Sequence, residues 1–345
     1  MKIVSKARQK IHQLRKKMAN KAIILMYHRV NELELDPWSL AVSPKHFAEH
    51  LEVIHEYTNP ISLKDLAKAH RNGNIQNRSI ALTFDDGYVD NLYQAKPLLE
   101  FYDIPATFFI TTGYMGQNRE FWWDELEQLL LQPGKLPEKL SLEINDDFYE
   151  WELATAAIYT KQDYQKDHNQ IAYKAKPGTR MFFYYSIWQK LQPLLEQERS
   201  SVMKQIINWV NLEPIKRTNY STLSAEEVSL FGESKLVEIG AHTVTHSYLS
   251  SLSEEQQYDE LKKSKDDLEL ILKRPITNFC YPYGNFTKRT SEIAQNVGFE
   301  CACSTFEDIL WHESNCFALP RIEIQNWNQE EFAARLLKYF SVKVP

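Results

Sequence analysis

A chain of 345 residues is long enough for one large α/β domain or two smaller ones. Its 43% hydrophobic and 25% charged residues are ordinary for a globular protein, and a net charge of −6 gives no reason to expect nucleic acid as a partner. No apolar run approaches the roughly 18 residues of a membrane span. The four cysteines have no zinc-finger spacing, so we expect reduced thiols at Cys280, Cys301, Cys303 and Cys316.

The N-terminal segment 1–21 contains eight Lys or Arg and no acidic residue, with apolar residues at helical spacing. It predicts a basic amphipathic helix, which either contacts an anionic membrane surface or packs on its own domain. A signal peptide fits poorly, because the short apolar stretch 22–27 runs directly into His28 and Arg29. We therefore expect a cytoplasmic protein, at the inner membrane surface if this helix binds there.

Strands and helices alternate along most of the chain. In order, the pattern predicts a strand at 23–26, helices at 44–57 and 63–69, a strand at 80–84, a helix at 91–102, a strand at 105–111 and a helix at 121–131. After residue 212 it predicts a short helix capped by Ser224, then a strand at 236–239, a helix at 253–273, a strand at 278–281, a helix at 287–297, strands at 301–304 and 321–324, and a helix at 329–339. Such repeats favour a parallel sheet or barrel, whose active site gathers at the C-terminal ends of the strands.

The alternation stops between residues 132 and 212. Two short strands, at 140–144 and 149–153, precede a long helical stretch at 181–210. Five of the eight tryptophans fall between Trp122 and Trp209. We expect an insertion subdomain at 132–212 with its own core, which leaves 22–131 and 213–345 for the main domain. Its aromatic residues are either ordinary packing or a wall for a sugar or a lipid.

Two adjacent carboxylates, Asp85 and Asp86, follow the apolar stretch 79–84. At the mouth of a buried strand they repel each other and lose hydration, so such a pair usually holds a cation or moves a proton. Gly87 permits a tight turn or the close approach of a ligand. An ordinary acidic turn is the alternative interpretation.

His242 and His246 also follow a predicted strand. On a helix, residues four apart share a face and can reach one ion. This spacing alone is weak evidence, since His46 and His50 share it on a helix away from any strand end, where we expect a surface pair. Asp86 with two imidazoles leaves open positions on a divalent metal, as catalytic sites require. Zinc suits these ligands, and cobalt, nickel or iron would also fit.

The runs 83–87 (Thr-Phe-Asp-Asp-Gly), 242–246 (His-Thr-Val-Thr-His) and 279–284 (Phe-Cys-Tyr-Pro-Tyr-Gly) resemble the first three motifs of the polysaccharide deacetylases, carbohydrate esterase family four. The run 105–109 (Pro-Ala-Thr-Phe-Phe) is also typical of that family. The resemblance covers roughly residues 22–125 and 213–340. It implies an α/β fold, a distorted (β/α) barrel of the NodB type, here with a mixed, mainly helical insertion.

The resemblance implies metal-dependent removal of acetyl groups from N-acetylated sugars. Asp85 would be the general base, while the metal polarises the acetyl carbonyl and activates a water. The oxyanion would be held by the metal and the Tyr283 N–H, with Tyr281 beside it on the substrate side. The implied metal ligands are Asp86, His242 and His246.

Two departures from the family pattern concern the partners of Asp85. The family's third motif usually has an Arg that orients the base; here that position is Cys280, and Arg321 is the candidate substitute. No His follows His312, although the family usually has a late His as general acid. We hypothesise that His28, at the end of the first strand, protonates the leaving amine. The alternative is a structural His beneath the metal site.

The leading hypothesis is a metal-dependent N-deacetylase acting on a saccharide or glycolipid of the cell envelope. One alternative keeps the hydrolase chemistry on a non-sugar amide. Another is a catalytically impaired, sugar-binding relative, which the missing Arg and late His favour. The complete set of two Asp and two His residues argues against pure binding, since a binding protein needs no spare base beside a metal.

Overall fold

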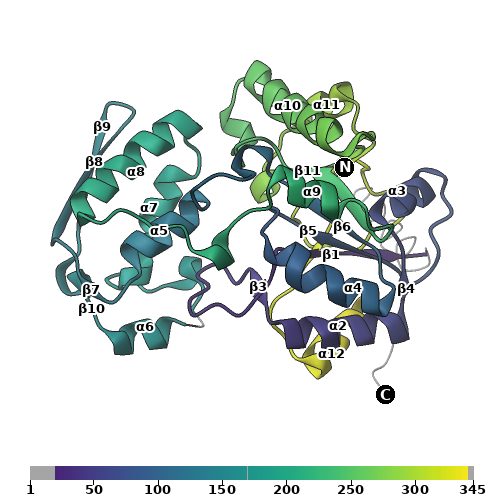
Figure 1. The fold of residues 1–345 in the computed structure, drawn as a ribbon, viewed down its shortest axis with the longest axis horizontal. Helices are drawn as coiled ribbons and strands as arrows, with labels where there is room; N and C mark the ends of the chain where they lie inside the picture. The colour runs from purple at the N-terminus through teal and green to yellow at the C-terminus, as the bar shows by residue number, and fades with distance from the viewer. Residues whose placement is uncertain (1–19, 169, 341–345) are drawn as a thin grey trace, which may run out of the picture.

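The computed structural model describes residues 20–168 and 170–340, so most of the predicted N-terminal helix lies outside the described residues. Within them, eight strands form one parallel sheet in the order β13-β12-β11-β6-β5-β1-β14, with β4 paired to the start of β5 (Figure 1). The strands are β1 (Ala22–Tyr27), β4 (Asn59–Pro60), β5 (Ser79–Phe84), β6 (Ala106–Ile110), β11 (Val237–Ala241), β12 (Asn278–Cys280), β13 (Cys301–Cys303) and β14 (Ile322–Glu323). This curled parallel sheet confirms the predicted NodB-type architecture.

Helices pack around this sheet. They are α2 (Pro44–Tyr57), α3 (Leu63–Arg71), α4 (Lys96–Tyr102), α9 (Ala225–Phe231), α10 (Glu254–Leu272), α11 (Lys288–Val297) and α12 (Gln329–Tyr339). In Figure 1, α10 and α11 lie above the sheet, and α2, α4 and α12 lie below it. Side-chain oxygens of Ser43, Ser62, Ser224 and Asn328 accept hydrogen bonds from the first turns of their helices, which explains why the sequence locates these starts well.

Strand β1 shows how one strand serves two cores. Ile23, Leu25 and Tyr27 belong to the large core shared with the outer helices. Ala22 and Ile24, on the other face, belong to a smaller core that includes residues of α3. All six residues of β1 are buried, as a parallel strand covered on both faces requires.

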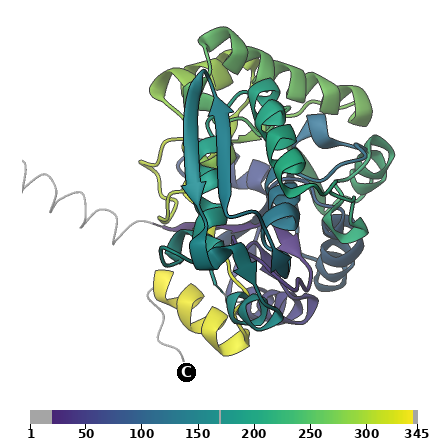
Figure 2. The same cartoon turned by 90° about the vertical axis from the view of Figure 1, so that its left-hand side faces the viewer.

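The insertion has a third core, rich in aromatic and Leu side chains. Its elements are β7 (Gly134–Lys135), β8 (Lys139–Ile144), β9 (Asp147–Glu152), β10 (Ile158–Tyr159), α6 (Lys161–Asp167), α7 (Arg180–Leu191) and α8 (Glu196–Val210). Helix α5 (Trp122–Leu130) contributes to the same core, so the insertion packs on the segment that precedes it. Figure 2, which faces this part of the molecule, shows the β8–β9 hairpin and α8 side by side. Among the described helices, none combines the length and apolarity needed to cross a bilayer.

Three expectations about local structure need correction. The stretch 181–210 is two helices, because Pro193 lacks the N–H that a continuous helix needs. The helix expected at 91–102 begins as a π-helical turn, η1 (Asn91–Ala95). His50, expected at the surface, is buried. Its Nδ1 lies 3.2 Å from the Tyr27 hydroxyl, and its Nε2 lies 2.8 Å from the Trp327 carbonyl oxygen.

Candidate active site

Asp85 and Asp86 leave the end of β5 in different directions. The Asp85 N–H donates to the carbonyl of Tyr27 on β1, which continues the sheet by one residue. Asp86 then adopts a left-handed conformation with φ 75°, followed by Gly87 with φ 85°. A side chain at Gly87 would be strained by this backbone conformation, and its Cβ would also press on Ile110 Cδ1 at 3.0 Å. The turn therefore separates the two carboxylates.

His242 and His246 occupy a loop after β11, which corrects the helical geometry expected from their spacing. Thr243 and His246 have φ of 62° and 54°, so the chain turns twice between the two imidazoles. Glu260 of α10 holds this loop: its Oε2 accepts from the N–H groups of Val244 and Thr245 at 2.8 and 2.9 Å. The loop geometry, rather than a helical face, brings the two rings to a centroid separation of 4.9 Å.

Both imidazoles point at Asp86. Its Oδ1 lies 3.5 Å from His242 Nε2 and 3.2 Å from His246 Nε2. Their candidate ligand atoms all lie within 4.8 Å of one another, and all three side chains are buried. The His242 Nδ1–H donates to the Cys280 carbonyl at 2.8 Å, which orients the ring so that Nε2 faces Asp86. This donor set, one carboxylate and two imidazoles, fits a divalent metal such as zinc.

The charges of these groups are shaped by burial and by each other. Burial would raise the pKa of Asp86, but hydrogen bonds from His242 and His246 outweigh it and hold that pKa well below its ordinary value. Burial lowers the pKa of His246 to about 4, so this imidazole is neutral at pH 7. An ionised carboxylate and a neutral imidazole are the forms that bind a metal.

Asp85 is paired with a different partner, Arg321, which directly precedes β14. The two guanidinium Nη atoms reach its two carboxylate oxygens at 2.7 and 2.6 Å, and both side chains are buried. The same guanidinium donates to Ser304 O and Thr83 Oγ1 at 2.8 and 3.0 Å. Burial would raise the pKa of Asp85, but the charge and hydrogen bonds of Arg321 lower it below its ordinary value. Asp85 is therefore held as an oriented carboxylate.

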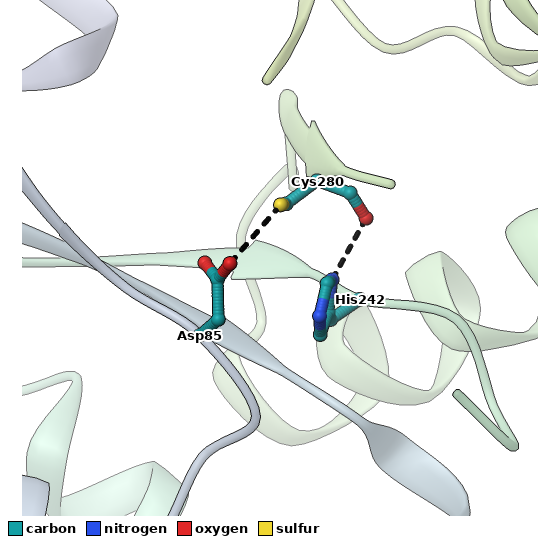
Figure 3. A group of neighbouring side chains, drawn as sticks. All are labelled: Asp85, His242 and Cys280. Carbon is teal, nitrogen blue, oxygen red and sulfur yellow. Dashed lines mark hydrogen bonds between the residues drawn. The ribbon is translucent and has the colours of Figure 1, made fainter. Parts of the chain in front are cut away.

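Cys280 contacts both Asp85 and His242: its Sγ faces the Asp85 carboxylate, and its carbonyl oxygen accepts from the His242 ring (Figure 3). Its Sγ is 3.5 Å from Asp85 Oδ2 and 2.9 Å from Arg321 Nη2. Asp85, His242 and Cys280 form a second group close enough to hold a metal. Burial raises the pKa of the Cys280 thiol to about 12. The geometry favours the group that contains Asp86, because the Arg321 guanidinium already contacts both the Asp85 carboxylate and the Cys280 Sγ.

His28 stands at the edge of the site, with its Nε2 4.0 Å from Asp85 Oδ2 and its side chain 17% exposed. Its backbone carbonyl accepts a hydrogen bond from Asn91, in the π-helical turn η1. Asp90, next to that turn, accepts from the side chain of Arg29 and the N–H of Val30. The backbone that carries His28 is therefore clamped, while its side chain reaches solvent.

The two tyrosines of the third motif, Tyr281 and Tyr283, have different surroundings. The Tyr281 hydroxyl lies 3.2 Å from Ser291 Oγ and 3.1 Å from the Phe317 carbonyl, and its ring stacks on Phe286, so this side chain serves the core rather than the substrate side. Tyr283 has φ 57°, and its ring lies 4.5 Å from that of His246.

Trp123 is a site neighbour that the sequence reading did not single out. Its ring lies 4.7 Å from the His246 ring, and its Nε1 donates to the Tyr88 hydroxyl at 3.0 Å. That hydroxyl donates in turn to Asp124. Trp123 lies in the first turn of α5, and this position in the sequence was the available signal. The tryptophan packs over a predicted ligand and shields it from water.

This fold and site define a class: an α/β half-barrel with buried carboxylates and imidazoles at the C-terminal ends of its strands. The family model described as polysaccharide deacetylase matches residues 72–135 and 196–302, and the gap between them falls within the insertion. The chain belongs to the polysaccharide deacetylase family.

Individual relatives match over shorter spans. A poly-β-1,6-N-acetyl-D-glucosamine N-deacetylase of Staphylococcus aureus is 28% identical over 113 residues, which cover 29% of this chain and 39% of the relative. YxkH of Bacillus subtilis is 27% identical over 108 residues, 31% of this chain and 37% of the relative. The matched region thus spans less than two-fifths of these curated relatives.

Two solved structures share the fold over nearly the whole chain. The deacetylase PplD of Streptococcus pyogenes aligns with a TM-score of 0.54 and 20% identity, covering 94% of this chain and 99% of PplD. IcaB of Ammonifex degensii aligns with a TM-score of 0.56 and 17% identity, covering 92% and 97%.

Proposed function

We propose that this protein is a metal-dependent hydrolase that removes N-acetyl groups from a saccharide. The observation that carries the proposal is the division of labour between adjacent carboxylates: Asp86 faces two imidazoles, and Asp85 is held apart by Arg321. A site that only bound a metal would not need the second, oriented carboxylate. The S. aureus relative, an N-deacetylase of an N-acetylglucosamine polymer, supports this substrate class.

In this proposal Asp86, His242 and His246 hold one divalent ion, zinc being the best fit to the ligand set. When bound, the ion polarises the acetyl carbonyl and lowers the pKa of a water in the site. The remaining work belongs to side chains and backbone groups of the chain itself.

Asp85 takes a proton as water attacks the acetyl carbon, and Arg321 keeps its carboxylate ionised and aimed during the transfer. The Tyr283 N–H donates to the developing oxyanion. His28 then gives a proton to the amide nitrogen as the C–N bond breaks, and acetate and a free amine leave. The partial exposure of His28 allows it to be reprotonated from solvent.

The test is acetate release from a panel of N-acetylated saccharides, free and lipid-linked, with a non-sugar N-acetyl amide as a comparison. We expect release from saccharides that a chelator abolishes and added Zn²⁺ restores. Asp85→Asn should abolish release while retaining metal, and His55→Ala, an exposed histidine on α2, should change neither. Release only from the non-sugar amide would reassign the substrate, and saccharide binding without release would indicate a catalytically impaired relative.

A further inference from the structure

A row of aromatic rings begins at His246 and runs into the insertion. The Tyr283 ring lies 4.5 Å from that of His246 and 5.9 Å from that of Trp188 on α7. Trp188 in turn lies 4.3 Å from Trp38 and 6.3 Å from Tyr185, whose ring is within 17° of parallel to it. We call Trp38, Tyr185, Trp188 and Tyr283 the aromatic row.

The four side chains of the aromatic row are half-buried, while the aromatic side chains behind them are buried. Trp122 packs behind Trp188 at 5.9 Å, with the rings 28° apart. The Tyr184 hydroxyl accepts from Trp38 Nε1 at 2.7 Å. These contacts fix the rings from behind, so the row is a rigid surface whose outer side is open to solvent.

Three distant parts of the chain build this surface. Trp38 lies in the loop between the short strands β2 (Arg29–Val30) and β3 (Ala41–Val42). Helix α7 of the insertion supplies the middle of the row, and the loop after β12 supplies Tyr283. The Ala172 N–H donates to the Pro37 carbonyl at 2.7 Å and ties the first loop to the insertion. The insertion is thereby placed against the site.

We propose that the aromatic row is a second sugar subsite, which stacks the pyranose next to the one whose acetyl group reaches Asp86 and the histidines. This inference rests on the proposed function and makes the substrate an oligosaccharide of at least two units. The C–H face of a pyranose is apolar, which suits the face of an aromatic ring. An acyl chain fits less well, because the row starts beside the charged Asp86 and buried imidazoles.

The test compares Trp188→Ala and Trp38→Leu with Trp151→Ala. Trp151 is a matched control, since it is half-buried and lies on β9 at the far edge of the insertion (Figure 1). Acetate release is measured on N-acetylglucosamine oligomers of one to five units. We expect wild-type kcat/KM to rise with length from one to two units, and this length advantage to fall about tenfold in both row variants. Trp151→Ala should keep it.

An unchanged length advantage in both row variants would overturn the subsite while leaving the deacetylase intact. The row variants could instead keep the length advantage and lose a preference for a lipid-linked over a free oligomer. That result would assign the aromatic row to a lipid and would also overturn the sugar subsite. If the wild-type protein releases acetate from none of the oligomers, the proposed function fails. Calorimetry of pentamer binding then still tests whether the aromatic row binds a sugar. A Kd for the pentamer that is about tenfold weaker in Trp188→Ala supports the subsite, and an equal Kd contradicts it.

Discussion

Arg321 grips the carboxylate of Asp85 with both arms of its guanidinium, at 2.6 and 2.7 Å, across 236 residues of sequence. Its other N–H groups bond to Ser304 O, Thr83 Oγ1 and Cys280 Sγ, so the buried cation is fully satisfied. The family resemblance implies an Arg at the position of Cys280. In this chain the cation that reaches Asp85 comes instead from Arg321, directly before β14.

Replacing Arg321 should separate orientation from metal binding. Arg321→Lys keeps the positive charge but loses the bidentate hydrogen bonding to Asp85. We therefore expect kcat to fall about 100-fold or more, while the metal content stays at the wild-type level. Arg321→Met leaves Asp85 buried and unpaired, which should cost about 3–5 kcal/mol of unfolding free energy. Turnover, metal analysis and urea unfolding check both variants. A lysine variant with wild-type kcat would remove the orienting role.

The two candidate ligand groups that share His242 make opposite predictions for metal content. His246→Ala should lower metal affinity at least 100-fold, because it deletes a ligand of the Asp86 group. Cys280→Ala should leave the metal in place, because Arg321 already contacts both the Asp85 carboxylate and the Cys280 Sγ. Metal titration of both variants decides between the groups. Loss of metal from Cys280→Ala alone would select the group containing Asp85.

His28 is expected to act on the leaving amine. His28→Ala should lower kcat 100- to 10,000-fold on amide substrates, with metal content retained. An activated acetyl ester, whose leaving group needs no proton, should lose much less. Near-normal turnover on the amide would exclude the acid role, whereas loss of metal would point to a structural role beneath the site.

His50 should make stability depend on pH. Burial lowers its pKa to about 4 from an ordinary value of 6.5 and outweighs the hydrogen bond to the Trp327 carbonyl, which raises that pKa. As pH falls from 6.5 to 4, the unfolded chain takes up a proton that the folded chain refuses, so stability falls by up to about 3 kcal/mol. Below pH 4 both states are protonated at this site and no more is lost.

The matched variant is His50→Gln, which can keep both hydrogen bonds but does not titrate. Unfolding free energies are measured by urea between pH 4 and 7.5. As pH falls, the wild type should lose up to about 3 kcal/mol more than His50→Gln, so the difference between the two proteins should change steadily toward the acidic end. Parallel curves would mean that His50 does not carry the effect.

Local chemistry was enough for much of the fold. Helix starts at Ser43, Ser62 and Ser224 were predicted because a side-chain oxygen caps its own first turn, an interaction within four residues. The helical stretch expected at 181–210 is interrupted near Pro193, a break that the sequence signalled and the prediction did not place. His50 was misplaced at the surface, because its partners Tyr27 and Trp327 lie far away in sequence.

The site shows the same contrast between what is local in sequence and what depends on contacts between distant residues. The sequence by itself determined which residue types are present: adjacent Asp85 and Asp86, and a histidine pair after a later strand. Only the tertiary structure decided that both imidazoles face Asp86, that they do so from a loop with two left-handed residues, and that Arg321, a candidate from the sequence, pairs with Asp85. The reason is physical: side-chain direction at a strand end depends on backbone turns and on neighbouring strands, which residue spacing does not encode.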